Sequence, residues 1–277
     1  MRRAARMVAA TFAVSAGAAP VAADGVCGDA IDQPIAVPWR DAGFDAAPGA
    51  CPVADVALAV RGRALIDTPA FYGTLGGDAT VAVRQRAGAH VAWGLAARAI
   101  DVTFIQNAVW TIVAPTVGPL VAHGSYGVDL RLADRPLRLA ALGQLALPFT
   151  RTDVDGSTGA AQLAGLASWR AGARWRVHAR VAALGWYGRA VTGTSTRAAA
   201  LAAIDLGWRA RRRLSVGVGV DAQLGWYRGG LDHLAVRVGA AWRLARCWRL
   251  GVAAGAPLAG VERQDAAVTL GVARDLE

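Results

Sequence analysis

The sequence contains no lysine, so all 30 of its basic residues are arginines, and with 20 acidic residues they leave a net charge of +10. A strongly basic protein ordinarily suggests nucleic acid or an acidic lipid surface as its partner. Here most arginines occur singly in alternating stretches and turns, apart from Arg2–Arg3 and Arg211–Arg213, and there is no basic helix and no aromatic motif for stacking on RNA bases. The composition therefore argues against nucleic-acid binding.

Cysteine is scarce, with three residues in 277, and no CxxC pair or Cys/His spacing suggests a metal site. We therefore expect neither a metal nor a cofactor. Cys27 and Cys51 flank a proline-rich segment without strand pattern, and an oxidising compartment would let them pair. Closing that loop would contribute about 3 kcal/mol. Cys247 is left outside the expected disulfide.

Long hydrophobic runs are also missing. The first apolar stretch, residues 7–18, is only about 12 residues long, whereas a membrane-spanning helix needs about 20. It follows three arginines and precedes small residues that end at Ala23, which is typical of a cleaved signal peptide. We therefore expect residues 1–23 to be removed on export and the mature chain to begin at Asp24.

One longer stretch, residues 102–128, carries no charged residue and could cross a bilayer by its length alone. Pro115 and Pro119 interrupt it, and a proline inside a helix would leave backbone groups unpaired in lipid. The stretch is therefore interpreted as the end of one strand, a loop and the start of another strand.

What the sequence does contain is a repeated alternation of apolar with small or polar residues, which is the period of a β-strand with two different faces. Residues 214–226 and 232–244 form the clearest hairpin. In the first of these segments the apolar face carries Val216, Val218, Val220, Ala222, Leu224 and Trp226, and the other carries Ser215, Gly217, Gly219, Asp221, Gln223 and Gly225.

The same pattern predicts about twelve strands. They span residues 53–66, 78–87, 90–105, 118–132, 137–149, 159–170, 175–187, 197–209, 214–227, 232–244, 248–259 and 265–276. Short connections at 88–89, 133–136, 171–174, 210–213 and 245–247 alternate with longer ones at 67–77, 106–117, 150–158, 188–196 and 260–264. The connection at 228–231 is an exception, because it is short where a long one is expected.

The tryptophans lie near strand ends. Close to the short turns, on the apolar face, are Trp169, Trp175, Trp208, Trp242 and Trp248. Near the opposite ends are Trp186, Tyr187, Trp226 and Tyr227, which we interpret as a second belt. Amphipathic rings prefer the headgroup level of a membrane, so two belts of this kind indicate two membrane faces.

Together, the alternation, the turn asymmetry and the aromatic belts resemble the smaller bacterial outer-membrane β-barrel proteins, over residues 53–276. The resemblance implies an all-β, closed antiparallel transmembrane barrel of about twelve strands, with short periplasmic turns and longer external loops. It also implies an outer-membrane location and two partners, outer-membrane lipid and the barrel-assembly machinery. Such barrels usually end on an aromatic residue, whereas this chain ends on Glu277. Residues 24–52 would form a periplasmic or plug segment, and residues 53–277 the barrel.

The alternation places a set of polar residues toward the lumen, among otherwise small side chains. We expect it to contain His123, Asp129, Arg131, Arg176, His178, Arg180, Asp205, Asp221, Arg237 and Arg243. A wall dominated by arginine would favour anions. The first interpretation is accordingly a structural barrel or a narrow passive channel.

Two other functions stay open at this point. The first is an outer-membrane enzyme acting on lipid or peptide. Ser125, His123 and Asp129 supply the residue types of nucleophilic catalysis, but on one strand same-face neighbours are about 7 Å apart and do not converge. We therefore expect no catalytic site. The second is a binding or adhesion barrel that uses its external loops.

Overall fold

The computed structural model describes residues 27, 49–51, 53–67, 72–106, 111–116, 118–147, 157–190, 193–225, 230–260 and 266–276. In these residues the chain forms antiparallel β-strands. They are β1 (Asp55–Asp67), β2 (Tyr72–Ala87), β3 (Val91–Gln106), β4 (Thr111–Thr116), β5 (Leu120–Leu132), β6 (Arg135–Leu147), β7 (Ser157–Trp169), β8 (Trp175–Ala190), β9 (Gly193–Arg211), β10 (Leu214–Leu224), β11 (Leu231–Ala245), β12 (Trp248–Ala259) and β13 (Ala266–Asp275). The described part of the chain holds no helix long and apolar enough to cross a membrane.

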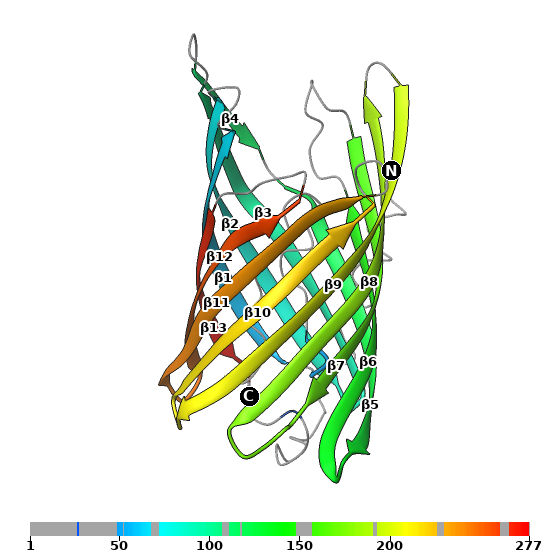
Figure 1. Cartoon of the computed structure of the whole chain (residues 1–277), viewed down its shortest axis with the longest axis vertical. Helices are drawn as coiled ribbons and strands as arrows, with labels where there is room; N and C mark the ends of the chain where they lie inside the picture. Colours follow the sequence, from blue (N-terminus) through cyan, green and yellow to red (C-terminus); the bar gives the residue numbers. More distant parts are fainter. Residues whose placement is uncertain are drawn as a thin grey trace, which may run out of the picture.

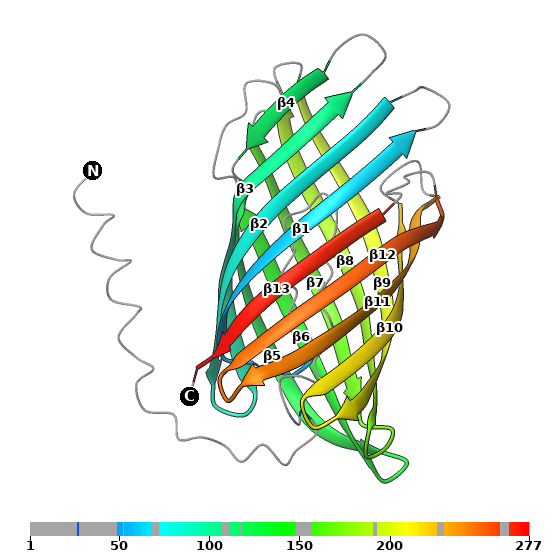
Figure 2. The same cartoon turned by 90° about the vertical axis from the view of Figure 1, so that its left-hand side faces the viewer.

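The strands close into a barrel of twelve wall positions, as the alternation predicted (Figure 1). β4 and β5 lie one after the other against β3 and together fill one position. The last strand, β13, lies between β12 and β1 (Figure 2). Its register with β1 runs from Asp55 opposite Asp275 to Ala64 opposite Ala266. The two ends of the sheet therefore satisfy each other's backbone groups, as a strand exposed to lipid requires.

Three of the predicted long loops are partly strand. β4 occupies part of the predicted loop at 106–117, and β2 begins at Tyr72, inside the predicted loop at 67–77. The predicted loop at 188–196 is also wrong, because β8 and β9 pair up to Ala190 and Gly193 and form a tall hairpin (Figure 1). Strand ends that project beyond a membrane need no apolar face, so their polar composition is similar to that of a loop.

We name the two rims by their connections. The short-turn rim carries residues 88–90, 133–134, 170–174, 212–213 and 246–247, and the loop rim carries the other connections. The expected exception at 228–231 disappears, because β10 ends at Leu224 and β11 begins at Leu231. That connection, at the loop rim, is therefore longer than predicted.

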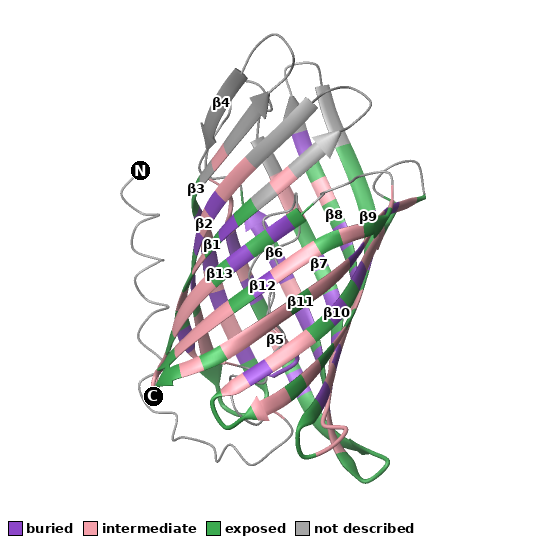
Figure 3. Cartoon of the chain, turned by 60° about the vertical axis from the view of Figure 1, so that its left-hand side comes forward, coloured by how far each residue is buried: buried purple, intermediate pink, exposed green. Residues whose placement is uncertain are grey.

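Buried and exposed residues alternate along the strands of the wall (Figure 3), so its two faces differ in character. Large apolar side chains are exposed on the outside, including Leu163 at 73%, Val181 at 66% and Val218 at 46%. Polar side chains are buried on the inside, among them Gln162 at 2% and Asp221 at 5%. This inverts the pattern of a water-soluble protein and is typical of a barrel whose outer surface meets lipid.

The predicted tryptophan belt lies on the outer face near the short-turn rim. Trp175 and Trp208 are cross-strand partners with ring centroids 6.1 Å apart. Trp242 and Trp248, which also lie close to short turns, are exposed as well. The assignment of Trp186 to a second outer belt is wrong. Its side chain packs against the buried inner cluster, while Tyr187 is exposed on the outside. Trp226 and Tyr227 lie outside the described residues.

Replacing Val218 by arginine should destabilise the folded barrel by about 2–4 kcal/mol. Val218 points outward near the middle of β10, so the arginine would place a charge in the lipid. The control is Gly207→Ser. Gly207 points inward beside Leu206, the cross-strand partner of Val218, and a Cβ there would lie 3.9 Å from the nearest atom, the Arg176 carbonyl oxygen. The neighbouring inward glycine, Gly219, is unsuitable because a Cβ there would collide with the Asp205 carboxylate.

Urea unfolding in lipid vesicles, followed by tryptophan fluorescence, measures both free energies of unfolding. Equal losses for Val218→Arg and Gly207→Ser would contradict the assignment of the two faces.

Candidate functional site

The inner wall of the barrel is the candidate site, because the buried polar side chains collect there. On β9, β10 and β11 they form a ladder of ion pairs. Arg237 Nη2 lies 2.9 Å from Asp205 Oδ1, and Arg237 Nε lies 2.6 Å from Asp221 Oδ1. His233 Nε2 continues the ladder at 3.3 Å from Asp221 Oδ2. Gly219 leaves the space that the Asp205 carboxylate occupies. Each buried charge in this ladder therefore has an opposite charge beside it.

A second ion pair lies on β1 and β2, and the sequence analysis did not find it. Arg61 and Asp78 are cross-strand partners, both almost fully buried, with Arg61 Nη2 2.6 Å from Asp78 Oδ2. The same carboxylate oxygen accepts a hydrogen bond from Arg61 Nε at 2.6 Å. The alternation of apolar and polar residues could have predicted that both side chains point inward. It could not have predicted that they pair, because pairing depends on the register between β1 and β2.

On the opposite wall, β6, β7 and β8 carry a mixed polar and apolar surface. Arg180 Nη2 donates to Gln162 Oε1 at 2.6 Å and to Gln144 Oε1 at 3.3 Å. Around these residues the wall is lined by leucines that are 5% exposed or less: Leu142, Leu166, Leu184 and Leu201. The expectation that small side chains fill the rest of the lumen is therefore wrong for this wall.

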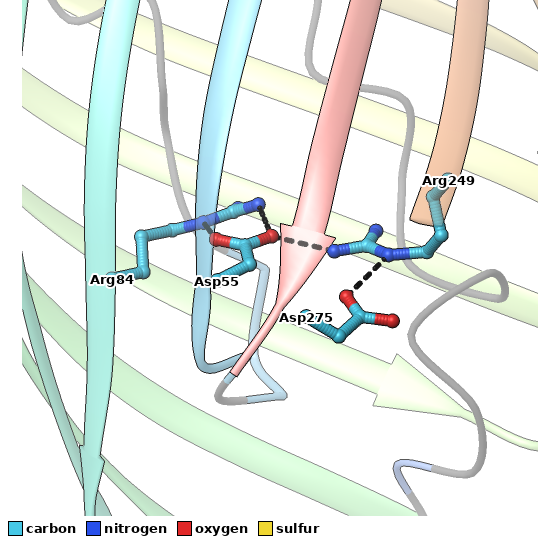
Figure 4. A network of polar contacts seen from close by, with 4 residues as sticks. All are labelled: Asp55, Arg84, Arg249 and Asp275. Carbon is cyan, nitrogen blue, oxygen red and sulfur yellow. Dashed lines mark hydrogen bonds and ion pairs between the residues drawn. The ribbon is translucent and has the colours of Figure 1, made fainter. Parts of the chain in front are cut away.

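A network of four charges joins the first and last strands at the short-turn rim (Figure 4). Asp55 is fully buried, and its carboxylate accepts hydrogen bonds from Arg84 Nε at 2.7 Å, Arg84 Nη2 at 2.5 Å and Arg249 Nη2 at 2.5 Å. Arg249 Nε also donates to Asp275 Oδ1 at 2.7 Å. The network thus ties β2, β1, β13 and β12 together across the closure.

The expected disulfide between Cys27 and Cys51 is present. Cys51 and Ala50 are buried, and Ala50 belongs to the same apolar cluster as the inner leucines. The carbonyl oxygen of Ala50 accepts a hydrogen bond from Arg138 Nε at 3.0 Å, and Arg138 Nη1 also donates to Asp129 Oδ1 at 2.9 Å. The end of the N-terminal segment is therefore held against the inner wall of β6. The expected signal peptide, residues 1–23, lies outside the described residues.

The remaining predicted lumen residues divide into two groups. His123, Arg176 and His178 are buried on inward positions, and Arg243 is half-buried on β11. Asp129 and Arg131 are exposed near the short-turn rim, although Asp129 is ion-paired to Arg138.

The structure does not assemble a catalytic triad from Ser125, His123 and Asp129. All three lie along β5, and the Asp129 carboxylate binds Arg138. A different row, Ser168, His178 and Asp205, does lie on neighbouring strands in register. Its carboxylate is bound by Arg237 on β11, so Asp205 is part of the ion-pair ladder described above. Within the described residues, no group of His, Cys, Asp or Glu could hold a metal ion.

The polar residues missed from the sequence are Arg61, Asp78, Asp55, Arg84, Arg138, Gln144, Gln162 and Arg249. Gln144 and Gln162 stand on inward positions of strands whose outward positions are apolar, so their parity was readable. They were passed over because no residue of those two strands was taken as a candidate.

Comparison with solved structures supports the fold. An outer membrane channel from Pseudomonas putida F1 is 14% identical, with a TM-score of 0.63, and the match covers 81% of this chain and 96% of that one. The β-domain of the Bordetella autotransporter Brka is 15% identical, with a TM-score of 0.53, and the match covers 81% of this chain and 100% of that one. No family model matches the chain, and no curated protein does. At these identities the likeness shows a shared fold, that of bacterial outer-membrane β-barrels.

Replacing Asp55 by asparagine should destabilise the closed barrel by about 3–5 kcal/mol, because it leaves Arg84 and Arg249 together without their shared buried carboxylate. Asp275→Asn is the control. Its side chain is 21% exposed and it accepts from Arg249 alone, so the loss should be smaller.

The temperature at which the unboiled, fast-migrating form converts to the unfolded form in detergent gels reports both losses. If Asp275→Asn lowers this temperature as much as Asp55→Asn, the buried carboxylate is not what holds the closure.

Proposed function

We propose that the chain is an exported outer-membrane barrel that forms a narrow passive channel for small anionic solutes. Residues 1–23 would be the signal peptide, residues 24–52 a segment that narrows the periplasmic mouth, and residues 53–277 the membrane barrel. The short-turn rim would face the periplasm, since both ends of the barrel sequence lie at that rim. Outer-membrane lipid and the barrel-assembly machinery would be the partners.

The observation that carries the proposal is the excess of inward cations. Among the described residues, the inward arginines include Arg61, Arg84, Arg98, Arg131, Arg138, Arg176, Arg180, Arg237, Arg243 and Arg249, against the carboxylates of Asp55, Asp78, Asp129, Asp205, Asp221, Asp232 and Asp275. A barrel that served only to fill the membrane has no need of this many buried charges. In a narrow pore, an arginine excess lowers the electrostatic barrier for anions and raises it for cations.

The N-terminal segment supports the second part of the proposal. Ala50 and Cys51 lie buried against the inner wall near the short-turn rim, and the disulfide to Cys27 closes a loop that leads to them. A segment held there takes up part of the cross-section of the mouth. Releasing it should therefore widen the pore.

An enzyme or a surface-binding barrel is the alternative. Ser125, His123 and Asp129 all lie along β5 and do not converge, and the strands β8 and β9 take up the polar segment that was expected to be an external binding loop. These observations favour the channel.

Single-channel recording in planar bilayers tests the proposal with the full mature chain. We expect small, steady conductance steps and a reversal potential in a potassium chloride gradient that corresponds to chloride selectivity. Reductant should raise the conductance, and the Cys27→Ser/Cys51→Ser chain should show the raised level without reductant. Cys247→Ser is the control and should respond to reductant as the parent does.

A chain that stays silent in both redox states would favour a structural barrel, and cation selectivity would contradict the role of the inward arginines.

A further inference from the structure

Arg180 is an inward arginine whose hydrogen-bond acceptors are neutral. Its Nη2 donates to Gln162 Oε1 at 2.6 Å and to Gln144 Oε1 at 3.3 Å. Its Nε has no hydrogen-bond partner, and in the part of the chain that the structure describes no carboxylate is paired with its guanidinium. An arginine side chain stays protonated in proteins. None of the described residues therefore neutralises the charge of Arg180.

Other inward arginines are paired with carboxylates. Arg61 lies 2.6 Å from Asp78, and Arg237 lies 2.9 Å from Asp205 and 2.6 Å from Asp221. The arginines of the four-charge network in Figure 4 are paired with aspartates as well. At a distance, two opposite charges act as a dipole, whose potential falls off faster than that of a single charge. The charge of Arg180 therefore reaches further into the lumen than that of a paired arginine.

The position of Arg180 in the barrel adds to this effect. On β8 it lies between Trp175, in the belt near the short-turn rim, and Tyr187, which is exposed on the outside toward the loop rim. Its level is thus near the middle of the membrane, where surrounding lipid makes the electrostatic barrier to an ion highest. Arg180 is half-buried, whereas Gln144 and Gln162 are 2% exposed. Part of the arginine side chain is therefore left facing the lumen.

We propose that Arg180 is the residue that determines the anion selectivity of the channel. Its charge lowers the barrier for an anion near the middle of the lumen and raises the barrier for a cation. The role rests on the proposed function, since it names the residue that gives the channel its selectivity. It needs no anion bound to Arg180, because the electrostatic potential of the charge is enough.

Single-channel recording of the full mature chain with Arg180→Gln tests the role. The reversal potential in a potassium chloride gradient gives the ratio of chloride to potassium permeability. We expect this ratio to fall about tenfold, because loss of the charge changes the barriers for the two ions in opposite directions. Glutamine is neutral and keeps an amide group that can donate a hydrogen bond. Heat-modifiable migration in gels confirms that the variant is folded.

Arg180→Lys separates the charge from the shape of the side chain. Lysine keeps the positive charge but lacks the planar guanidinium that faces the two glutamines. The permeability ratio should therefore stay within about twofold of the parent value. A fall as large as that of Arg180→Gln would mean that the guanidinium acts by its shape and hydrogen bonds, and it would overturn the proposal.

Two controls examine where the charge must lie. Arg135→Gln makes the same charge change on an exposed residue at the short-turn rim, where salt screens it. The double variant Arg61→Gln/Asp78→Asn removes a buried ion pair of the inner wall and leaves the net charge unchanged. Both should leave the permeability ratio within about twofold. A fall in either control equal to that of Arg180→Gln would overturn the special role of Arg180.

The parent chain separates this role from the channel itself. A parent that selects chloride, with Arg180→Gln unchanged from it, overturns the role of Arg180 alone. A parent that stays silent or selects potassium overturns the proposed channel, and the role of Arg180 with it.

Discussion

The structure depends on one constraint: no backbone hydrogen-bonding group in the wall can be left exposed to lipid. An open sheet would present an unpaired edge on its first and last strands, and closure of β1 against β13 removes both edges. Closure fixes the number of strands, and the number of strands sets the width of the lumen. The charge network of Asp55, Arg84, Arg249 and Asp275 lies at this junction, and it includes an ion pair between Asp55 and Arg249, which are 194 residues apart in the sequence.

The interior follows from the same constraint. Because the outer face that meets lipid must be apolar, the polar side chains of the spanning strands collect on the inner face, where they need partners. The wall formed by β9 to β11 solves this with alternating charges, as in Asp205, Arg237 and Asp221. The wall formed by β6 to β8 does so incompletely, since Arg180 satisfies the oxygens of Gln144 and Gln162 but not their amide groups.

Much of the fold could be predicted, because a period of two with one apolar face has few stable outcomes once nearly every strand shows it. The parity of Asp221 and Arg237 came from this alternation, whereas the pairing of Cys27 with Cys51 came from the expected export to an oxidising compartment. Register could not be predicted, since it depends on how the strands shift on closure. That is why the contact between Asp55 and Arg249, which are 194 residues apart in the sequence, was missed. The predicted loop at residues 188–196 was wrong, because the polar composition of these strand ends is similar to that of a loop.

The central claim, closure of the first strand on the last in the stated register, has a direct test. Gly271 lies opposite Ala59, and a Cβ at Gly271 would be 3.7 Å from the Ala59 Cβ, a separation that suits a disulfide. In a Cys247→Ser background, Ala59→Cys with Gly271→Cys should cross-link under mild oxidation in membranes, and mass spectrometry of the digested protein should find the joined peptides. The control pair Ala59→Cys with Ala267→Cys, which is out of register, should remain unlinked. An absent cross-link in the first pair, or equal yields in both, would contradict the closed barrel described here.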